Sequence, residues 1–141
     1  RMGMSHVIPE LIYKINKLNN FEALDVYSIN HTRTFCYIDD AVNMLLKIAE
    51  KNETKGILLN LGTDKPEIKM GDLANIIISI SKKKLKVNPL TDHLGSPLRR
   101  CPDMKKTLDI LNYTYTIDLL GGLHNTFKWY MKTFKEDIYN K

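Results

Sequence analysis

The sequence predicts a small mixed α/β fold in which several helices alternate with short strands. Apolar residues recur at helical spacing in several separate stretches, and brief apolar runs bounded by turn residues lie between them. At 141 residues, the chain is long enough to bury one core and forms at most one domain. No internal repeat or low-complexity segment divides it, so we expect one unit over residues 1–141.

The first predicted elements are a helix over residues 7–18 and a strand over residues 23–27. The helix is indicated by apolar residues at helical period, with Pro9 near its front, where a missing N–H costs least. Residues 28–31 are polar and predict a loop.

The stretch over residues 32–40 is the one around which we expect the chain to be organised. It predicts a short strand with its aromatic residues on one face, followed by a helix that runs to about residue 51. Asp39 or Asp40 is expected to cap that helix, because a carboxylate accepts hydrogen bonds from the first free N–H groups.

The middle of the chain predicts one more strand and one more helix. An apolar run over residues 56–62 predicts a strand stopped by glycine, and a helix is expected around residues 73–80. Three lysines follow at residues 82–84, where cations complement the negative end of that helix. A brief extended piece is expected at residues 85–87.

The last part predicts an irregular stretch over residues 89–102 and two further helices. Asp103 is expected to cap the first of them, and Asn112 to end it in the left-handed conformation. The final helix carries apolar residues over residues 119–130. The polar tail from Thr133 is expected to fray.

Charge and cysteine content limit the class of partner and compartment. The formal net charge of +5 favours anionic partners, and phosphate metabolites, nucleic acids and membrane surfaces all qualify. Cys36 and Cys101 form no Cys-x-x-Cys pair, which suits a reducing compartment. No apolar run is long enough to span a bilayer and no signal peptide is visible. We therefore expect a cytoplasmic protein without a membrane partner.

Motifs that carry chemistry are absent from the sequence. There is no Gly-x-Gly-x-x-Gly, no phosphate loop and no cluster of metal ligands, and the four histidines are scattered. We expect no catalytic residue, no cofactor-binding residue and no metal site in this chain. Arg33 and the pair Arg99-Arg100 stand beside loop junctions, where a guanidinium can fork onto a carboxylate or a phosphate.

Seven short motifs follow one another along the chain: His6-Val7-Ile8-Pro9, Val26-Tyr27, Thr32-Arg33-x-Phe35-x-Tyr37-Ile38-x-Asp40, Asn60-Leu61-Gly62, Asp72-Leu73-Ala74, Arg100-Cys101-Pro102-Asp103 and Gly122-Leu123-x-x-Thr126-x-x-Trp129-Tyr130. In order and spacing they resemble the carboxyl-terminal part of nucleotide-sugar epimerases, dehydratases and decarboxylases of the extended short-chain dehydrogenase/reductase family. The resemblance covers nearly the whole chain, which makes it more specific than any one motif.

This resemblance implies that the chain is the substrate-binding part of an NAD-dependent enzyme whose amino-terminal Rossmann half is not in the sequence. In the family that half holds NAD and carries the Ser/Thr and the Tyr-x-x-x-Lys pair that move the hydride. The 141 residues alone are therefore expected to be inactive and to bind no NAD. Epimerisation, dehydration and decarboxylation remain open as the parent reaction.

The resemblance also implies a set of substrate-binding residues. Arg33 and Arg100 match family arginines that contact the diphosphate of a nucleoside diphosphate sugar. Val7, Ile8 and Tyr27 match positions that line the nucleobase and ribose pocket, and His31 falls where many relatives have a glutamine near the ribose. The family's usual helix cap before residue 70 is replaced by Lys69, so we expect a weaker helix start there.

Two other functions remain open. One is a standalone, non-catalytic module that binds nucleotide sugars. The other is a basic nucleic-acid-binding domain, which is disfavoured because the aromatic residues are not interleaved with the lysines as stacking platforms require. We also expect exposed apolar surface on the side of the absent half, which a homodimer is one way to cover.

Overall fold

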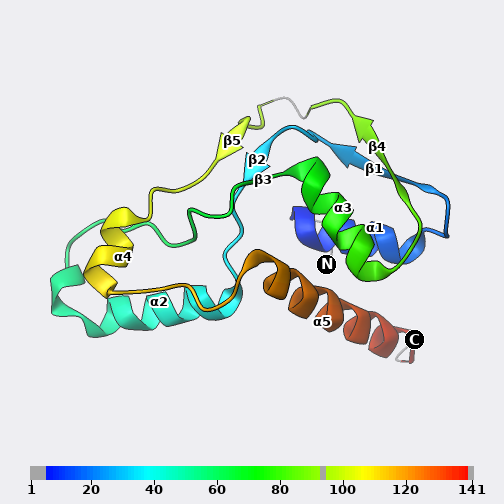
Figure 1. Ribbon diagram of the computed structural model, residues 1–141. Coiled ribbons are helices and arrows are strands. Elements are labelled where there is room, and N and C mark those ends of the chain that lie inside the picture. The colour runs from blue at the N-terminus through cyan, green and yellow to red at the C-terminus, as the bar shows by residue number, and fades with distance from the viewer. Residues whose placement is uncertain (1–5, 93–94, 140–141) are drawn as a thin grey trace.

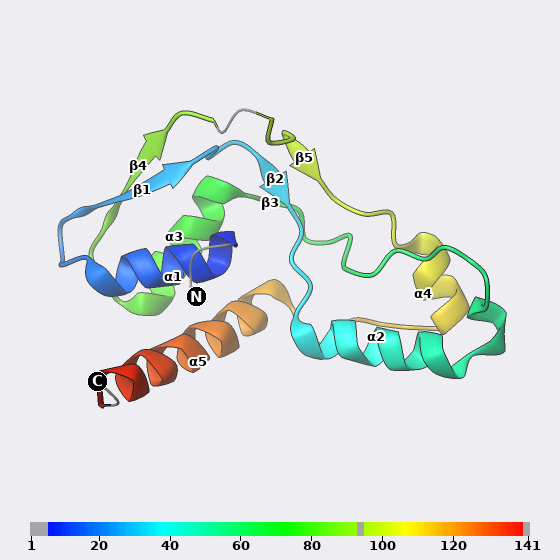
Figure 2. The ribbon, with the colours of Figure 1, turned by 180° about the vertical axis from the view of Figure 1, so that it is seen from behind.

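The computed structural model describes residues 6–92 and 95–139. Three helices, α1 (Val7–Lys17), α3 (Met70–Ser81) and α5 (Leu119–Tyr139), pack beside the parallel pair β1 (Ala23–Tyr27) and β4 (Lys86–Leu90). A second lobe holds α2 (Ile38–Glu50), η1 (Asn52–Thr54) and α4 (Lys105–Leu111) (Figures 1 and 2). Short strands join the two lobes, and the small mixed α/β fold is thereby confirmed.

The joining strands form a three-stranded sheet in the order β3-β2-β5. Strand β2 (Thr32–Arg33) is the central one, antiparallel to β3 (Ile68–Lys69) and parallel to β5 (Arg99–Arg100). Each strand has only two residues, so few backbone hydrogen bonds hold the sheet.

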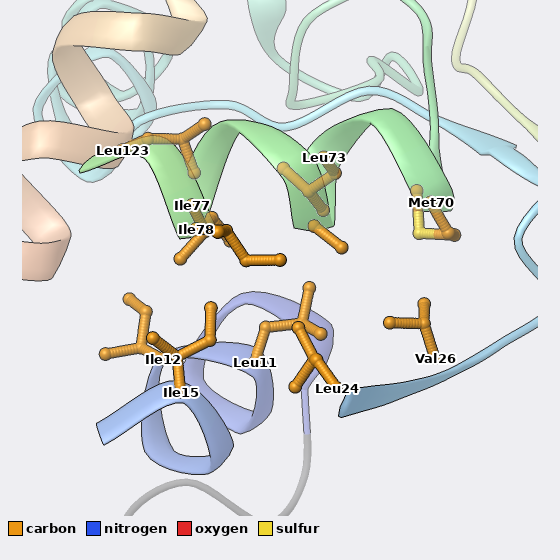
Figure 3. Close-up of a cluster of buried hydrophobic side chains, with 11 residues drawn as sticks. Leu11, Ile12, Ile15, Leu24, Val26, Met70, Leu73, Ile77, Ile78 and Leu123 are labelled. Atoms are coloured by element: carbon orange, nitrogen blue, oxygen red, sulfur yellow. The ribbon is translucent and has the colours of Figure 1, made fainter. Parts of the chain in front are cut away.

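The main core lies where α1, α3 and β1 meet. Their buried side chains point toward one another across the space between the two helices (Figure 3), and Leu123 of α5 joins them. The buried members are Leu11, Ile12, Ile15, Leu24, Val26, Met70, Leu73, Ala74, Ile77, Ile78 and Leu123. This core fixes the start of α1 and the end of β1, two walls of the candidate site described below.

The helix α3 begins without a side-chain cap, as Lys69 predicts. Its first free N–H groups are nevertheless satisfied: Met70 N–H donates to the carbonyl of His31 at 3.0 Å, and Gly71 N–H to that of Ile29 at 3.0 Å. A Cβ at Gly71 would lie 3.4 Å from the Ile29 carbonyl oxygen. The glycine therefore lets the β1–β2 loop sit close enough to act as the cap.

The three lysines at residues 82–84 are expected to complement the negative end of α3, and for Lys83 this prediction is wrong. Its ammonium does not serve the end of α3 but donates to the carbonyls of Ile15, Asn16 and Leu18 at 2.8, 3.0 and 2.6 Å. These carbonyls are the unpaired acceptors at the end of α1. Lys83 thus ties α1 to the segment that follows α3, a contact between residues far apart in the sequence.

Four expected secondary-structure features differ from the structure. The stretch over residues 89–102 is not wholly irregular, because it contains the end of β4 and the whole of β5. The strand beginning at Thr32 ends at Arg33, and residues 34–37 form an irregular link to α2. Residues 56–62 form no strand, because their described neighbours at residues 103–107 contact them through side chains and make no backbone ladder with them. Helix α5 continues to Tyr139, past Thr133, the residue from which fraying is expected.

Other expected boundaries hold. Strand β1 covers the predicted residues, and α1 ends at Lys17, one residue short of the prediction. Asp103 accepts a hydrogen bond from Lys105 N–H at 2.9 Å at the start of α4. Asn112 closes that helix with φ of 46°, in the left-handed region.

The aspartate at the start of α2 has a different task from the expected cap, since no side chain caps that helix. Asp40 is buried, and its Oδ1 accepts hydrogen bonds from the hydroxyl of Tyr113 and from the N–H and hydroxyl of Thr116, at 2.6, 2.9 and 2.7 Å. Its Oδ2 accepts from Ile117 N–H at 3.1 Å. One carboxylate therefore holds the link between α4 and α5 against α2.

The contacts of Asp40 displace two pKa values. Burial alone raises the pKa of Asp40, but the hydrogen bonds from Tyr113, Thr116 and Ile117 outweigh it and hold that pKa below its usual value. Burial and the bond to Asp40 raise the pKa of Tyr113 to about 12. Both shifts favour the charge state that the folded chain uses, a carboxylate that accepts from a neutral phenol.

The apolar stripe of α2 faces outward. Ile38, Val42, Leu45 and Leu46 are 62%, 43%, 51% and 56% exposed, whereas Met44 of the same helix is buried against α4. Leu58 in the neighbouring irregular segment is 88% exposed. The second lobe therefore carries exposed apolar side chains, and that this is the side of the absent half stays a prediction.

We expect Asp40→Ala to destabilise the chain by about 2–4 kcal/mol, because several buried donors would lose their acceptor. Urea unfolding followed by circular dichroism measures this. Asp39→Ala is the matched control: it removes an exposed carboxylate from the same helical turn and should cost less than about 1 kcal/mol. Equal effects of the two substitutions would contradict the role of Asp40.

The pH dependence follows from the direction of the Asp40 shift. A depressed folded-state pKa contributes stability that is present above the unfolded-state pKa and is lost as the pH falls through the folded-state value. The stability difference between wild type and Asp40→Ala should therefore be constant near neutral pH and shrink below about pH 4.

Candidate functional site

A cavity of about 580 Å³ lies between the start of α1, the end of β1 and the last residues of β2 and β5. We call it the arginine cavity. All six residues that the resemblance implies for substrate binding line it: Val7, Ile8, Tyr27, His31, Arg33 and Arg100. They come from four elements and one loop, so the fold brings together residues that are far apart in the sequence.

The two arginines are register partners in the parallel pairing of β2 with β5. Residues opposite one another in neighbouring strands share a face of the sheet, and both side chains line the arginine cavity. Burial and the neighbouring Arg100 lower the pKa of Arg33 below its usual value, although a guanidinium stays protonated at any physiological pH. Two like charges thus stand side by side at one end of the cavity.

Arg33 is already oriented by the chain. Its Nη1 donates to the carbonyl of Thr32 at 2.7 Å and to that of Leu98 at 3.4 Å. Its Nη2 donates to Ser96 Oγ at 3.1 Å and to the Pro97 carbonyl at 2.8 Å. These neutral acceptors leave its charge uncompensated, so an anion would meet Nε–H or replace one of the loop contacts.

Arg100 is exposed, and its guanidinium makes no hydrogen bond or ion pair with any other described residue. It therefore contributes an unpaired positive charge to the cavity. A pair of guanidinium groups without a carboxylate partner is favourable for a polyanion such as a diphosphate.

His31 is 2% exposed, and neither ring nitrogen has a hydrogen-bond partner among the described residues. Nε2 lies 3.4 Å from Asp92 Oδ2, close enough for an ionic contact but without hydrogen-bond geometry. Leaving a buried polar group unsatisfied costs about 1–3 kcal/mol. A polar ligand group in the cavity would remove that cost.

Helix α1 and strand β1 give the cavity a mixed wall. Val7 and Ile8 from the first turn of α1 and Tyr27 at the end of β1 are its apolar part, and Glu10, Lys14 and Asp25 are its charged part. The ring of Tyr27 is 40% exposed, and Lys14 Nζ stands 5.8 Å from its centroid. A flat, half-exposed aromatic ring beside aliphatic side chains suits stacking with a planar group.

Arg99 lies on the opposite face of β5 from the cavity. Its Nε is 2.9 Å from each carboxylate oxygen of Glu67, and its Nη2 is 2.8 Å from Oε2. The hydroxyl of Thr32 donates to the same carboxylate. Hydrogen bonds from Arg99 and Thr32 lower the pKa of Glu67, and Glu67 raises that of Arg99.

A second cavity, of about 540 Å³, lies between the start of α2 and the links that precede α3 and α5. Its carboxylates already have partners: Asp40 holds the link after α4, and Asp118 accepts from Gly121 N–H at 2.7 Å as the cap of α5. Within residues 6–92 and 95–139, no three metal-ligating side chains gather at one point. In that same part of the chain, no helix is long and apolar enough to cross a membrane.

Sequence reasoning missed several residues around the arginine cavity, among them Glu67, Ser96 and Asp92. Ser96 and Asp92 carry no pattern of their own: Ser96 lines the cavity from the segment before β5, and Asp92 lies beside His31 after β4. The opposite placement of Arg99 and Arg100 could have been inferred, since successive residues of a strand point to opposite faces.

We expect Arg100→Gln to leave the melting temperature unchanged or raise it, because it removes a charge that repels Arg33 and has no partner in the described chain. Arg99→Gln, its neighbour, should lower the melting temperature, because it breaks the two-point contact with Glu67. Differential scanning fluorimetry of the two variants at low ionic strength measures this. A loss of stability in Arg100→Gln as large as that in Arg99→Gln would contradict the account.

Comparison with known proteins points to one family. The model of the NAD dependent epimerase/dehydratase family matches residues 1–62. UDP-glucuronic acid decarboxylase 1 of Danio rerio is 29% identical over 121 residues, which are 85% of this chain and 28% of that protein. UDP-glucuronic acid decarboxylase 3 of Arabidopsis thaliana is 29% identical over 92 residues, covering 65% of this chain and 26% of the relative. The chain thus spans little more than a quarter of these curated relatives.

Solved structures show the same fold. UDP-glucose 4-epimerase from Thermotoga maritima, solved with UDP-glucose, superposes with a TM-score of 0.81 at 19% identity over 94% of this chain and 41% of its own. UDP-glucuronic acid 4-epimerase from Bacillus cereus, solved with UDP-glucuronic acid and NAD, superposes with a TM-score of 0.78 at 23% identity over 92% of this chain and 40% of its own. Over residues 1–62 the chain thus matches the NAD dependent epimerase/dehydratase family, and over most of its length it has the fold of these solved epimerases.

Proposed function

We propose that this chain is the substrate-binding part of a longer NAD-dependent nucleotide-sugar enzyme and that the arginine cavity binds the nucleoside diphosphate. The observation that carries the proposal is the pair Arg33 and Arg100, side by side on one cavity-facing side of β2 and β5. Two charge-assisted contacts to one diphosphate would fix its orientation.

The arginine pair and the mixed wall of the cavity suit the two parts of such a ligand. The diphosphate lies against the guanidinium groups, and the nucleobase lies on Tyr27, beside Val7 and Ile8. His31, buried and without a hydrogen-bond partner among the described residues, then donates to or accepts from the ribose. Relatives solved with UDP-sugars support this choice of ligand class.

NAD does not fit the residues of this chain. The sequence has no glycine-rich turn between a strand and a helix, the arrangement that accepts a dinucleotide pyrophosphate. We therefore assign NAD and the hydride chemistry to a part of the protein outside this chain. The residues here bind and orient the sugar nucleotide, which sets the geometry on which hydride transfer depends.

The exposed apolar surface of the second lobe supports this division. Val42, Leu45 and Leu46 on α2 and Leu58 of the same lobe are exposed apolar side chains of the kind that a longer protein would bury. The curated relatives extend well beyond the region matched, since the chain spans 28% of the zebrafish protein. We propose that the NAD-binding part covers this surface.

Two alternatives are distinguished by simple observations. A coding region for a Rossmann unit directly upstream supports the larger enzyme, whereas a start codon at this segment would favour a standalone module. The nucleic-acid alternative has lost support, because Lys83 is bonded to α1 carbonyls and Lys84 Nζ lies 5.9 Å from the Phe21 ring centroid. Lys82, Lys84 and Lys86 stay exposed, so the basic surface that remains is a single short cluster.

We expect calorimetric titration of the chain with UDP, dTDP, GDP and CDP to show saturable binding of one diphosphate. Arg33→Ala and Arg100→Ala should each weaken that binding by about 1.5–3 kcal/mol, the range for hydrogen bonds to charged groups. Lys105→Ala is the control, because it also removes one positive charge but lies on α4, where Lys105 pairs with Asp109. Absence of binding by the folded chain, or equal weakening in all three variants, would contradict the proposal.

A further inference from the structure

We propose that Glu67 is a positioning residue of the arginine cavity: it fixes the register of β5 on β2 and thereby places Arg100 beside Arg33. This inference rests on the proposed function, because it assigns Glu67 a role in binding the same anion. Glu67 does not line the cavity, so any effect on the ligand must pass through the strands.

Glu67 holds Arg99 and Thr32 in a specific geometry, and we call these contacts the Glu67 clamp. The Glu67 carboxylate receives three contacts from Arg99 of β5, at 2.9, 2.9 and 2.8 Å, and one from the Thr32 hydroxyl of β2. Thr32 and Arg99 are themselves register partners. One side chain thus bridges the two strands at a single rung, on the face opposite the arginine cavity.

The strands need such a bridge because they are short. A two-residue pairing offers few backbone hydrogen bonds to oppose a shift, and a shift of one residue turns every side chain to the other face. Such a shift of β5 would point Arg99 into the cavity and Arg100 out of it. The contact with Glu67 is lost in that register, so it selects the register observed.

The Glu67 clamp also gives the adjacent Arg99 and Arg100 different roles. Arg99 has its charge matched by Glu67 on the outer face, whereas Arg100 has no described partner and faces the cavity. Without this separation, both guanidinium groups of the Arg99-Arg100 pair could approach the same anion in several arrangements. A single arrangement is what orientation of a sugar nucleotide requires.

Neutralising Glu67 changes anion binding in opposite directions in the two cases. Glu67→Gln raises the net charge of the chain by one next to an anion site, and through-space electrostatics alone would then strengthen anion binding. Loss of positioning would weaken it. The sign of the effect therefore separates a positioning role from a merely electrostatic one.

The experiment is calorimetry of the 141-residue chain with UDP and with inorganic pyrophosphate, for wild type, Glu67→Gln, Arg100→Ala and the double variant. We expect Glu67→Gln to weaken binding of both probes about threefold or more, and to have no further effect once Arg100 is alanine. Asp109→Asn is the control, because it also removes an exposed, paired carboxylate but on α4; it should leave binding unchanged or slightly tighter.

Each other outcome overturns the inference. If Arg33→Ala and Arg100→Ala weaken binding but Glu67→Gln leaves it unchanged or tighter, Glu67 is not a positioning residue, while the proposed function stands. If folded wild type binds neither probe, both fail. Should Glu67→Gln not fold by circular dichroism, Arg99→Lys replaces it: this variant keeps the charge, loses the two-point contact and is expected to weaken binding in the same way.

Discussion

The pairing of β2 with its two neighbours is the constraint on which the structure depends. This segment contacts three parts of the chain. Thr32 N–H donates to the Leu98 carbonyl at 2.8 Å, and the His31 carbonyl accepts from the first N–H of α3. Arg33 is the register partner of Arg100 in β5. The segment therefore joins the main core, the loop before β5 and the arginine cavity. A displacement of β2 would disturb all three together.

The arginine cavity is held at a cost in stability. Two guanidinium groups repel one another, and a buried imidazole has no hydrogen-bond partner within the described part of the chain. Proteins retain such features where a ligand repays the cost. Among the residues that the structure describes, the two ring nitrogens of His31 are the buried side-chain polar atoms without a hydrogen-bond partner, whereas Asp40 accepts from four donors.

Local patterns predicted the helices well and the long-range contacts poorly. The apolar periodicity of α1, α3 and α5 can be read from residues close together in the sequence. The turn at Asn112 depends only on the backbone conformation of that residue. Asp40 and Lys83 were misassigned because their partners lie tens of residues away. The apolar run at residues 56–62 predicted a strand, but a strand also needs a neighbour. The six site residues were grouped by resemblance, not by spacing, and their binding role stays a prediction.

The most direct test of the arginine cavity is the side-chain NMR spectrum of the four arginines during titration with UDP. We expect the Nε–H resonances of Arg33 and Arg100 to shift together and saturate at one equivalent, while that of Arg99, held by Glu67, stays in place. A spectrum in which Arg33 and Arg100 do not respond, or in which Arg99 shifts as much as they do, would contradict a diphosphate site built on these two residues.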